Sequence, residues 1–563
     1  MKIIKENKQD HLEVRTDHKA NPSLMIGLIL FAFCLSACKK SPDPENDNNP
    51  ITERKDKINS NLDSIFQYAQ QIYLWNEQLP AKTTFNPSRF FNAGANSEIA
   101  IYKDEIMAIS KFAINPLNNN PFEYNALNLI KPKYSSIIEM NASPSTDTNI
   151  NTSDNDYGIA FVGTANNEVR LLYVDANSAA GLLKLHRGLK VMAINGKTAT
   201  TTPDYYSFIS AALKEQNMTI TIEELTNGQP NSKTVQLSKR PYRKNPVLAY
   251  KIIKEGLKKI GYIAYNSFTY EEDSRRYLDP IFSMFSTEGI SELVVDLRYN
   301  GGGYQSTAIY LANKIAPAST NGKLMFTEFY NKMMQDGKAD LLKNQPLLDG
   351  DDQPIYIDGR IATLMDIDYS PAGNSFLFEQ QLGPSIEVRK VSFIVSNKTA
   401  SSSELLINVL KPYMELKIIG VSTDGATNVK TYGKPVGFFD IRIDRYKMYL
   451  AMYQDKNAHG EGDFFDGLPA DLSTEDEVSV DFGEKNDPAI SAILGNSNTL
   501  ASRKENSVAK SSQIRSGSSS SNRLTSKTYL LPEADVSGMI KTAKQFKLKT
   551  KNITDERQQK KQL

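Results

Sequence analysis

Between residues 51 and 134 the apolar residues of the chain recur at helical intervals. Ile58, Leu62 and Ile65 follow one another at steps of three or four positions, the spacing of one helix face. This spacing predicts a small helical domain over residues 55–150. The end of that domain, from about residue 140, is rich in Ser, Thr, Asn and Asp, a composition typical of a linker.

A second pattern, of short strands in which apolar and polar residues alternate, begins at Tyr157. Strands are expected at residues 169–174, 190–194 and 218–223, around a short helix near residues 178–183. Asn195-Gly196 directly follows the second of these strands, and this dipeptide favours a tight hairpin turn. Residues 156–240 are therefore predicted to form a small β-rich domain.

Residues 245–495 alternate apolar strands with amphipathic helices. Strands are expected at residues 260–265, 293–297, 391–395 and 417–420, and helices near residues 271–286, after residue 303 and from residue 402. This alternation predicts a layered α/β core. Residues 316–390 are irregular by comparison, which indicates an insertion that caps the core.

The leader of the chain has the features of an export signal. Its apolar run from Leu24 to Leu35 is shorter than the roughly 20 residues of a membrane-spanning helix. The run ends in Leu-Ser-Ala-Cys, which resembles a bacterial lipoprotein signal over residues 1–37 and implies cleavage before Cys38 and lipid on its thiol. An ordinary signal peptide that ends beside a free cysteine is the alternative.

The expected location follows from that leader. Residues 38–54, rich in Pro, Asp and Asn, are predicted to tether the folded part to the anchor. We expect an exported protein whose lipid anchor lies in a bacterial cell-envelope membrane, with the outer membrane as the expected one and either the periplasmic or the surface face.

Net charge argues against a nucleic-acid partner. The chain has 66 Lys and Arg against 65 Asp and Glu, a formal net charge of +1. The charge is uneven, because residues 501–563 hold 14 basic against 5 acidic residues, a net +9. Residues 496–563 are accordingly predicted to be a basic low-complexity tail.

The cysteine and histidine positions exclude the common metal sites. Both cysteines, Cys34 and Cys38, and two of the four histidines lie in the leader, while His186 and His459 are far apart in sequence. The sequence therefore predicts no metal site. Catalysis would depend on hydroxyls, carboxylates, lysines or main-chain amides.

Two short segments stand where a predicted strand meets a predicted helix, the usual place for sites in α/β sheets. Three glycines at residues 301–303 follow the strand that ends near Leu297 and allow close approach of main-chain N–H groups to an anion. The segment lacks the Lys-Ser/Thr ending of a phosphate-binding P-loop. The other segment, residues 399–404, presents Ser401 either as a nucleophile or as a helix cap with Glu404 completing a capping box.

Together these segments resemble a known enzyme family. Asp-Leu-Arg-Tyr-Asn-Gly-Gly-Gly at residues 296–303, followed by Thr-Ala-Ser-Ser-Ser-Glu at residues 399–404, is similar to the motifs of the C-terminal processing, or tail-specific, serine peptidases. The likeness covers residues 157–472 and matches the PDZ-containing bacterial lipoprotein type. It implies a multidomain α+β fold: an N-terminal helical domain, a PDZ-like domain over residues 156–240, and a ClpP/crotonase-like α/β peptidase core over residues 245–495 with a cap insertion.

The family resemblance also implies a Ser/Lys dyad that requires no organic cofactor. Ser401 aligns with the nucleophile, and Thr-Tyr-Gly-Lys at residues 431–434 repeats the family pattern that contains the lysine base, Lys434. Burial can lower a lysine pKa from about 10.4 to about 7 or 8, where the amine accepts a proton. The usual spacing from the nucleophile falls on Ala426, so an insertion within residues 421–430 is inferred. Lys430 as the base, or an inactive enzyme, is the alternative.

Other site residues follow from the same resemblance. The oxyanion donors would be the main-chain N–H of Ser402 and that of Gly302 or Gly303. A glutamine found one helical step after the lysine in some members is replaced here by Phe438.

The resemblance implies peptide or protein substrates, recognised by their C-termini. In a PDZ domain a peptide adds as a strand and its terminal carboxylate enters a main-chain nest, here at Gly158, Ile159, Ala160 and Phe161. The predicted function is a serine endopeptidase that cleaves exported proteins or peptides. The alternative is an inactive, membrane-tethered peptide-binding scaffold, motivated by Ala426; a glycan or lipid hydrolase is less favoured, because no sugar-binding aromatic cluster is evident.

Overall fold

The computed structural model describes most of the chain between its two ends. The described residues are 50–92, 94–95, 97–126, 128–140, 155–164, 166–226, 229–349, 352–379, 386–422, 426–495 and 526–530. The chain divides into a unit of residues 1–53 and a compact unit of residues 54–563. Cys38, the predicted signal peptide and most of the tether lie outside the described residues. No helix within the described ranges is long and apolar enough to cross a membrane.

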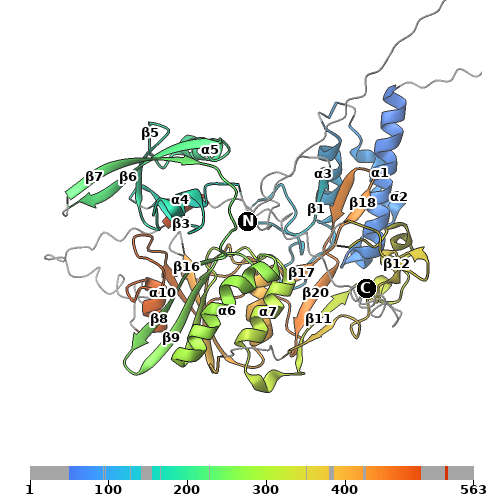
Figure 1. Ribbon diagram of the computed structural model, residues 1–563. Coiled ribbons are helices and arrows are strands. Elements are labelled where there is room, and N and C mark those ends of the chain that lie inside the picture. The colour runs from blue at the N-terminus through green and yellow to red at the C-terminus, as the bar shows by residue number, and fades with distance from the viewer. Residues whose placement is uncertain are drawn as a thin grey trace, which may run out of the picture. The chain divides into compact units, whose positions relative to one another are not determined.

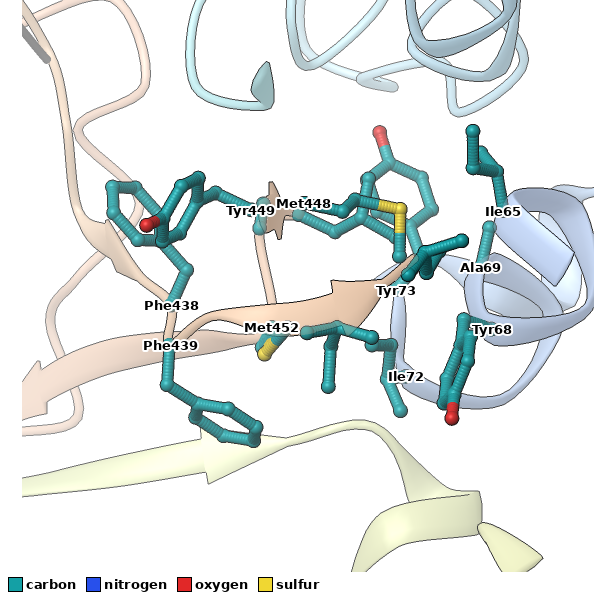
Figure 2. Packing of buried hydrophobic residues seen from close by; sticks show 14 of the residues in the cluster. Ile65, Tyr68, Ala69, Ile72, Tyr73, Phe438, Phe439, Met448, Tyr449 and Met452 are labelled. Atoms are coloured by element: carbon teal, nitrogen blue, oxygen red, sulfur yellow. The ribbon is translucent and has the colours of Figure 1, made fainter. Parts of the chain in front are cut away.

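The N-terminal part is helical up to residue 109, as its apolar spacing predicts. Its elements are α1 (Pro50–Ile72), η1 (Asn76–Gln78), α2 (Lys82–Phe85), η2 (Pro87–Phe90) and α3 (Glu98–Ile109), followed by the strand β1 (Ser136–Glu139). The apolar face of α1 does not pack within this part alone. Figure 2 shows Ile65, Ala69 and Ile72 of α1 in one hydrophobic cluster with Met448 and Met452.

The strand β1 explains why this core is shared. It pairs antiparallel with β19 (Tyr446–Tyr449), which in turn pairs with β18 (Ile441–Ile443). Ile137 lies opposite Met448 in this small sheet, and both side chains are buried. The region predicted as a helical domain over residues 55–150 is therefore not closed on itself, because its helices bury their apolar faces against a sheet contributed largely by the C-terminal half.

Residues 155–240 form a β-rich region with a hydrophobic core of its own. The elements are β2 (Ile159–Thr164), β3 (Val169–Val174), α4 (Ala179–Leu182), β4 (Lys190–Ile194), β5 (Lys197–Thr198), α5 (Pro203–Ala212), β6 (Asn217–Thr226) and β7 (Gln229–Ser238). Asn195 and Gly196 both have positive φ, 48° and 76°, as the predicted hairpin turn requires. The sheet order is β22-β2-β3-β4-β6-β7, in which β22 (Ser526–Leu530) lies within the predicted tail.

A six-stranded sheet forms the centre of the α/β core, in the order β21-β16-β15-β10-β9-β8. Its strands are β8 (Val247–Glu255), β9 (Lys258–Tyr265), β10 (Glu292–Asp296), β15 (Lys390–Val395), β16 (Glu415–Ser422) and β21 (Leu472–Glu475). All neighbours pair parallel except β8 and β9, which form an antiparallel hairpin. Four of these strands lie where the sequence predicts them.

Both faces of this sheet are covered, which its nearly continuous apolar strands require. On one face Val295 packs in a cluster with α6 (Glu271–Glu288), α7 (Gln305–Ile315) and α9 (Ser402–Leu410). The helices α6 and α7 lie side by side (Figure 1). On the other face Val294 packs with α10 (Pro488–Ile493) and with Val162 of β2.

The insertion predicted over residues 316–390 is built from short elements and joins a second small sheet. Its elements are η3 (Ala318–Thr320), β11 (Leu324–Tyr330), α8 (Lys332–Gln335), η4 (Asp340–Asn344), β12 (Tyr356–Ile357), β13 (Arg360–Ile361), η5 (Leu364–Asp366) and β14 (Ser375–Leu377). The sheet order is β14-β11-β20-β17, with β17 (Val436–Gly437) and β20 (Tyr453–Asn457). The insertion thereby shares a sheet with β17, the strand that directly follows Lys434, with β20 between β17 and β11.

Candidate active site

Ser401 occupies a sharp turn between β15 and α9. Its φ is 57° and its ψ −118°, a positive-φ backbone conformation that is uncommon for a residue with a side chain. Two hydroxyls fix the turn to the neighbouring strand end: Thr399 Oγ1 donates to Leu297 O at 2.8 Å, and Ser396 Oγ donates to Arg298 O at 2.5 Å. The strain is held by the surrounding contacts, so the turn presents the Ser401 side chain at the start of a helix.

The glycine loop of residues 301–303 lies against this turn. A Cβ at Gly302 would come within 2.8 Å of Ala400 O, and one at Gly303 within 2.1 Å of Phe268 O, so neither position accepts a side chain. Their φ angles, 106° and 140°, are also in the region that favours glycine. The Gly302 N–H donates to Asn300 Oδ1 at 2.8 Å. Of the two predicted glycine donors, Gly303 is therefore the candidate for an oxyanion.

The structure brings Lys434 to the same place. One pocket brings together the glycine loop, the turn at Ser401 (the nucleophile turn) and the loop that contains Lys434 (the lysine loop). Its lining residues are Gly303, Gln305, Ser401, Ser402, Leu405, Lys434, Val436, Gly437, Phe438, Tyr453 and Asp455. The Lys434 amine lies over the Phe438 ring, 4.5 Å from its centroid. Ala426 and Lys430 are exposed and are not among the lining residues.

Burial sets the electrostatics of Lys434. Its side chain is only 5% exposed, and burial lowers its pKa to about 7, against the opposing charges of Glu404 and Glu123. Near neutral pH a large fraction of this amine is therefore unprotonated. Such an amine can accept a proton from a hydroxyl in the same pocket.

Glu404 connects the nucleophile turn to the lysine loop, a role that its helix-cap position alone does not predict. Its carboxylate accepts hydrogen bonds from the N–H of Ser401 (2.9 Å), Gly433 (2.7 Å) and Lys434 (2.8 Å), and from the Thr431 hydroxyl. Burial raises the pKa of Glu404, while these hydrogen bonds lower it. The sequence signal for this link is the threonine three residues before the lysine, combined with the glutamate of the capping box.

The N-terminal part supports the lysine loop from its other side. Tyr134 OH donates to Gly433 O at 2.7 Å, and the Lys133 amine lies 5.0 Å from the centroid of the Tyr432 ring. These contacts join residues almost 300 positions apart in the chain. Sequence reasoning missed them because nothing in the local pattern of residues 133–134 indicates which loop they contact.

A buried cluster of charges is centred on Arg298, which shortly precedes the glycine loop in the sequence. The guanidinium of Arg298 bonds Asp296 at 2.7 Å, Asp487 at 2.9 Å and Asp476 at 3.2 Å. Asp476 also bonds Arg187 of the β-rich region at 2.9 Å. Burial acts to lower the pKa of Arg298, but the charges of Asp296, Asp487 and Asp476 keep it well above its ordinary value. The cluster thus fixes the end of β10 and holds the β-rich region to the core.

The residues expected to bind a peptide terminus lie at the start of β2. Gly158 has a φ of +65°, and a Cβ there would come within 2.2 Å of Ser178 Cβ. The Gly158 N–H donates to Asp156 Oδ1 at 2.6 Å, while Ile159, Ala160 and Phe161 are buried strand residues. Within the described ranges no group of three His, Cys, Asp or Glu side chains is arranged to hold a metal ion.

Comparison with known proteins identifies the core. The family model of peptidase family S41 matches residues 259–460, a stretch that contains Ser401 and Lys434. Residues 259–460 are similar to peptidase family S41. The resemblance to C-terminal processing peptidases is thereby confirmed at the level of the family, and the S41 region is that of a serine peptidase. No curated protein matches the chain.

Two solved structures match most of the chain. A Bacteroides fragilis protein described as an S41 protease is 21% identical, with a TM-score of 0.50, over 77% of this chain and 95% of its own. The photosystem II D1 C-terminal processing protease is 12% identical, with a TM-score of 0.41, over 78% of this chain and 98% of its own. The first of these supports a shared α/β fold.

Proposed function

We propose that the chain is a serine endopeptidase in which Ser401 is the nucleophile and Lys434 the general base. The observation that carries the proposal is the shared pocket, in which a serine on a strained turn meets a buried lysine whose pKa is lowered to about 7. The alternative of an inactive scaffold rested on Ala426. Because Ala426 is exposed and Lys434 lines the pocket, that position no longer argues for lost activity.

The proposed reaction needs only groups of this chain and water. Ser401 Oγ attacks the peptide carbonyl as Lys434 Nζ takes the hydroxyl proton, and the N–H groups of Ser402 and Gly303 stabilise the oxyanion. The C–N bond then breaks as the Lys434 ammonium returns the proton to the leaving amine. Water attacks the acyl-enzyme with Lys434 again as base, which releases the acid and regenerates Ser401.

Residues 155–240 are proposed to recognise the substrate C-terminus. An extended peptide would add as a strand beside β2, with its carboxylate near the main chain at Gly158. What supports this assignment is the positive φ of Gly158 and its position directly before β2. This assignment adds to the peptidase proposal which end of a substrate the protein binds first.

The test uses the purified chain with a peptide that has an apolar free C-terminus and with the same peptide amidated. Mass spectrometry should show cleavage that Ser401→Ala and Lys434→Ala each reduce by at least about a thousandfold. Lys430→Ala is the matched control, since this exposed lysine of the same loop lies outside the pocket. Unchanged cleavage in either pocket variant would remove that residue from the mechanism, and equal cleavage of the amidated peptide would contradict recognition of the terminus.

Lipid anchorage at Cys38 is proposed from the Leu-Ser-Ala-Cys sequence. Bacteria that express the chain and are fed a labelled fatty acid should label the parent protein, and Cys38→Ala should abolish the label and leave the protein unprocessed. Label retained in Cys38→Ala would contradict the anchor. Equal labelling of Cys34→Ala, the neighbouring cysteine, is the matched control.

A further inference from the structure

The outer edge of β2 is occupied by a segment from the far end of the chain. β22 pairs antiparallel with β2 in the register Phe161 with Leu530, Val162 with Tyr529 and Gly163 with Thr528. The opposite edge of β2 pairs with β3. The strand order places β22 at the end of the sheet, so β2 would be an edge strand without it. The tail thus contributes one strand to the β-rich region.

The edge of β2 is suited to the addition of a strand. All six residues of β2 are buried. Phe161 packs into the core of the β-rich region, while Ala160 and Val162 pack against the six-stranded sheet. With both faces covered, the main-chain N–H and C=O groups along one side are the only part of β2 that another segment can reach. An apolar strand with such an edge readily pairs with other chains.

The direction of β22 is that expected for a bound peptide. Because the pairing is antiparallel, β22 runs from Thr164 toward Phe161, and so toward Gly158 at the start of β2. A peptide whose C-terminal carboxylate lies near Gly158 would run the same way along the same edge. The tail strand and such a peptide therefore need the same hydrogen-bonding groups of β2, and the two cannot bind there together.

The sequence of the tail agrees with this role. Residues 496–525 are rich in Ser and Asn, whereas residues 528–531 read Thr-Tyr-Leu-Leu, a run of strand-forming and apolar residues. A segment joined by a chain of this length acts at an effective concentration on the order of millimolar. A strand with even weak affinity for β2 would therefore keep the edge occupied for most of the time.

We propose that residues 526–530 are a built-in ligand of the β2 edge, which a substrate peptide must displace before it binds. The proposal rests on the peptide recognition proposed above for residues 155–240, and adds the identity of the resident occupant. The apparent affinity for a peptide in solution is reduced by the fraction of molecules in which the edge is open. A substrate terminus must therefore bind β2 tightly enough to displace the tail strand.

The test uses the full chain in a Ser401→Ala background, so that no cleavage is required. Thr528→Pro/Tyr529→Pro removes two successive N–H groups from β22, one of which must point toward β2 in an antiparallel pair. Ser518→Pro/Ser519→Pro, in the same tail but outside β22, is the matched control. The probe is a fluorescent peptide of residues 526–531, Ser-Lys-Thr-Tyr-Leu-Leu, with a free carboxylate.

Two readouts separate the outcomes. Hydrogen exchange of the β2 amides should accelerate, and the Kd for the probe should fall by about tenfold or more, in the β22 variant alone. Equal exchange in all three proteins would overturn the proposal, because the tail would not cover the edge. Fast exchange without tighter binding would also overturn it, because the covered edge would then take no peptide. Neither result depends on cleavage, which the Ser401 and Lys434 variants test separately.

Discussion

Lys434 and Arg298 are both basic side chains buried from solvent, with exposed fractions of 5% and 1%. Their pKa values nevertheless move in opposite directions. Burial lowers the pKa of Lys434 to about 7, because it exceeds the opposing effect of Glu404 and Glu123. Burial acts on Arg298 in the same direction, but three hydrogen-bonded carboxylates keep its pKa well above its ordinary value. The balance between burial and carboxylates, rather than burial alone, decides whether a cation in this protein is a proton acceptor or a fixed charge.

The two positions also differ in what they do for the site. Arg298 forms ion pairs with three aspartates and so fixes the end of β10. It thereby supports the loop that contains Gly302 and Gly303. Lys434 lies in the pocket itself, where a charge that is easily lost is useful for proton transfer. Removal of each cation should therefore affect different properties of the protein.

The largest expected effect is the loss of stability on Arg298→Met. This change leaves Asp296, Asp476 and Asp487 close together without their central cation, and removing one partner of a buried ion pair costs about 3–5 kcal/mol. Urea unfolding should show a large drop in the free energy of unfolding. Lys434→Met is the matched control and should unfold at or above the urea concentration of the parent, because burial disfavours the charged form of the amine that the apolar side chain replaces. An equal drop in the free energy of unfolding in the two variants would contradict the difference proposed between Arg298 and Lys434.

A smaller effect is expected in the pH dependence of cleavage. Lys434 acts as a base only when unprotonated, so kcat/KM should fall as the pH decreases through about 7 and level off above it. Between pH 6 and pH 8 the rise should be about tenfold, as measured by initial rates on one peptide. Lys430→Ala should keep the same profile. A rate that is constant from pH 6 to pH 9 would contradict a lysine base.

The smallest expected effect is a displacement of that profile in Glu404→Gln. The charge of Glu404 raises the pKa of Lys434, so its removal should move the midpoint of the profile to lower pH. Relative to its own plateau, activity at pH 6 should then increase by about two- to fivefold. A lower plateau is expected as well, because glutamine cannot accept all the main-chain hydrogen bonds of this carboxylate. An unchanged midpoint with a lower plateau would show that Glu404 acts only on the position of the loop.

Much of the fold could be predicted from local patterns. The expected strands at residues 260–265, 293–297, 391–395 and 417–420 coincide with β9, β10, β15 and β16, since parallel strands buried on both faces give continuous apolar runs. The strand β8 was missed because it mixes lysines with apolar residues, as an outer strand can. The helical domain predicted over residues 55–150 shares its core with segments of the C-terminal half, and the local sequence of residues 55–150 does not indicate those partners.

By itself the sequence determined the resemblance to a peptidase family, the strand-to-helix turns and the candidate residues Ser401 and Lys434, because these depend on short motifs and local periodicity. Only the tertiary structure decided that Lys434, and not Lys430, lines the pocket with Ser401, since the burial of a side chain is set by distant segments. It also decided the link through Glu404, the support from Tyr134 and the pairing of the tail with β2. Each of these joins residues far apart in the chain, where contact depends on packing and leaves no pattern in the local sequence.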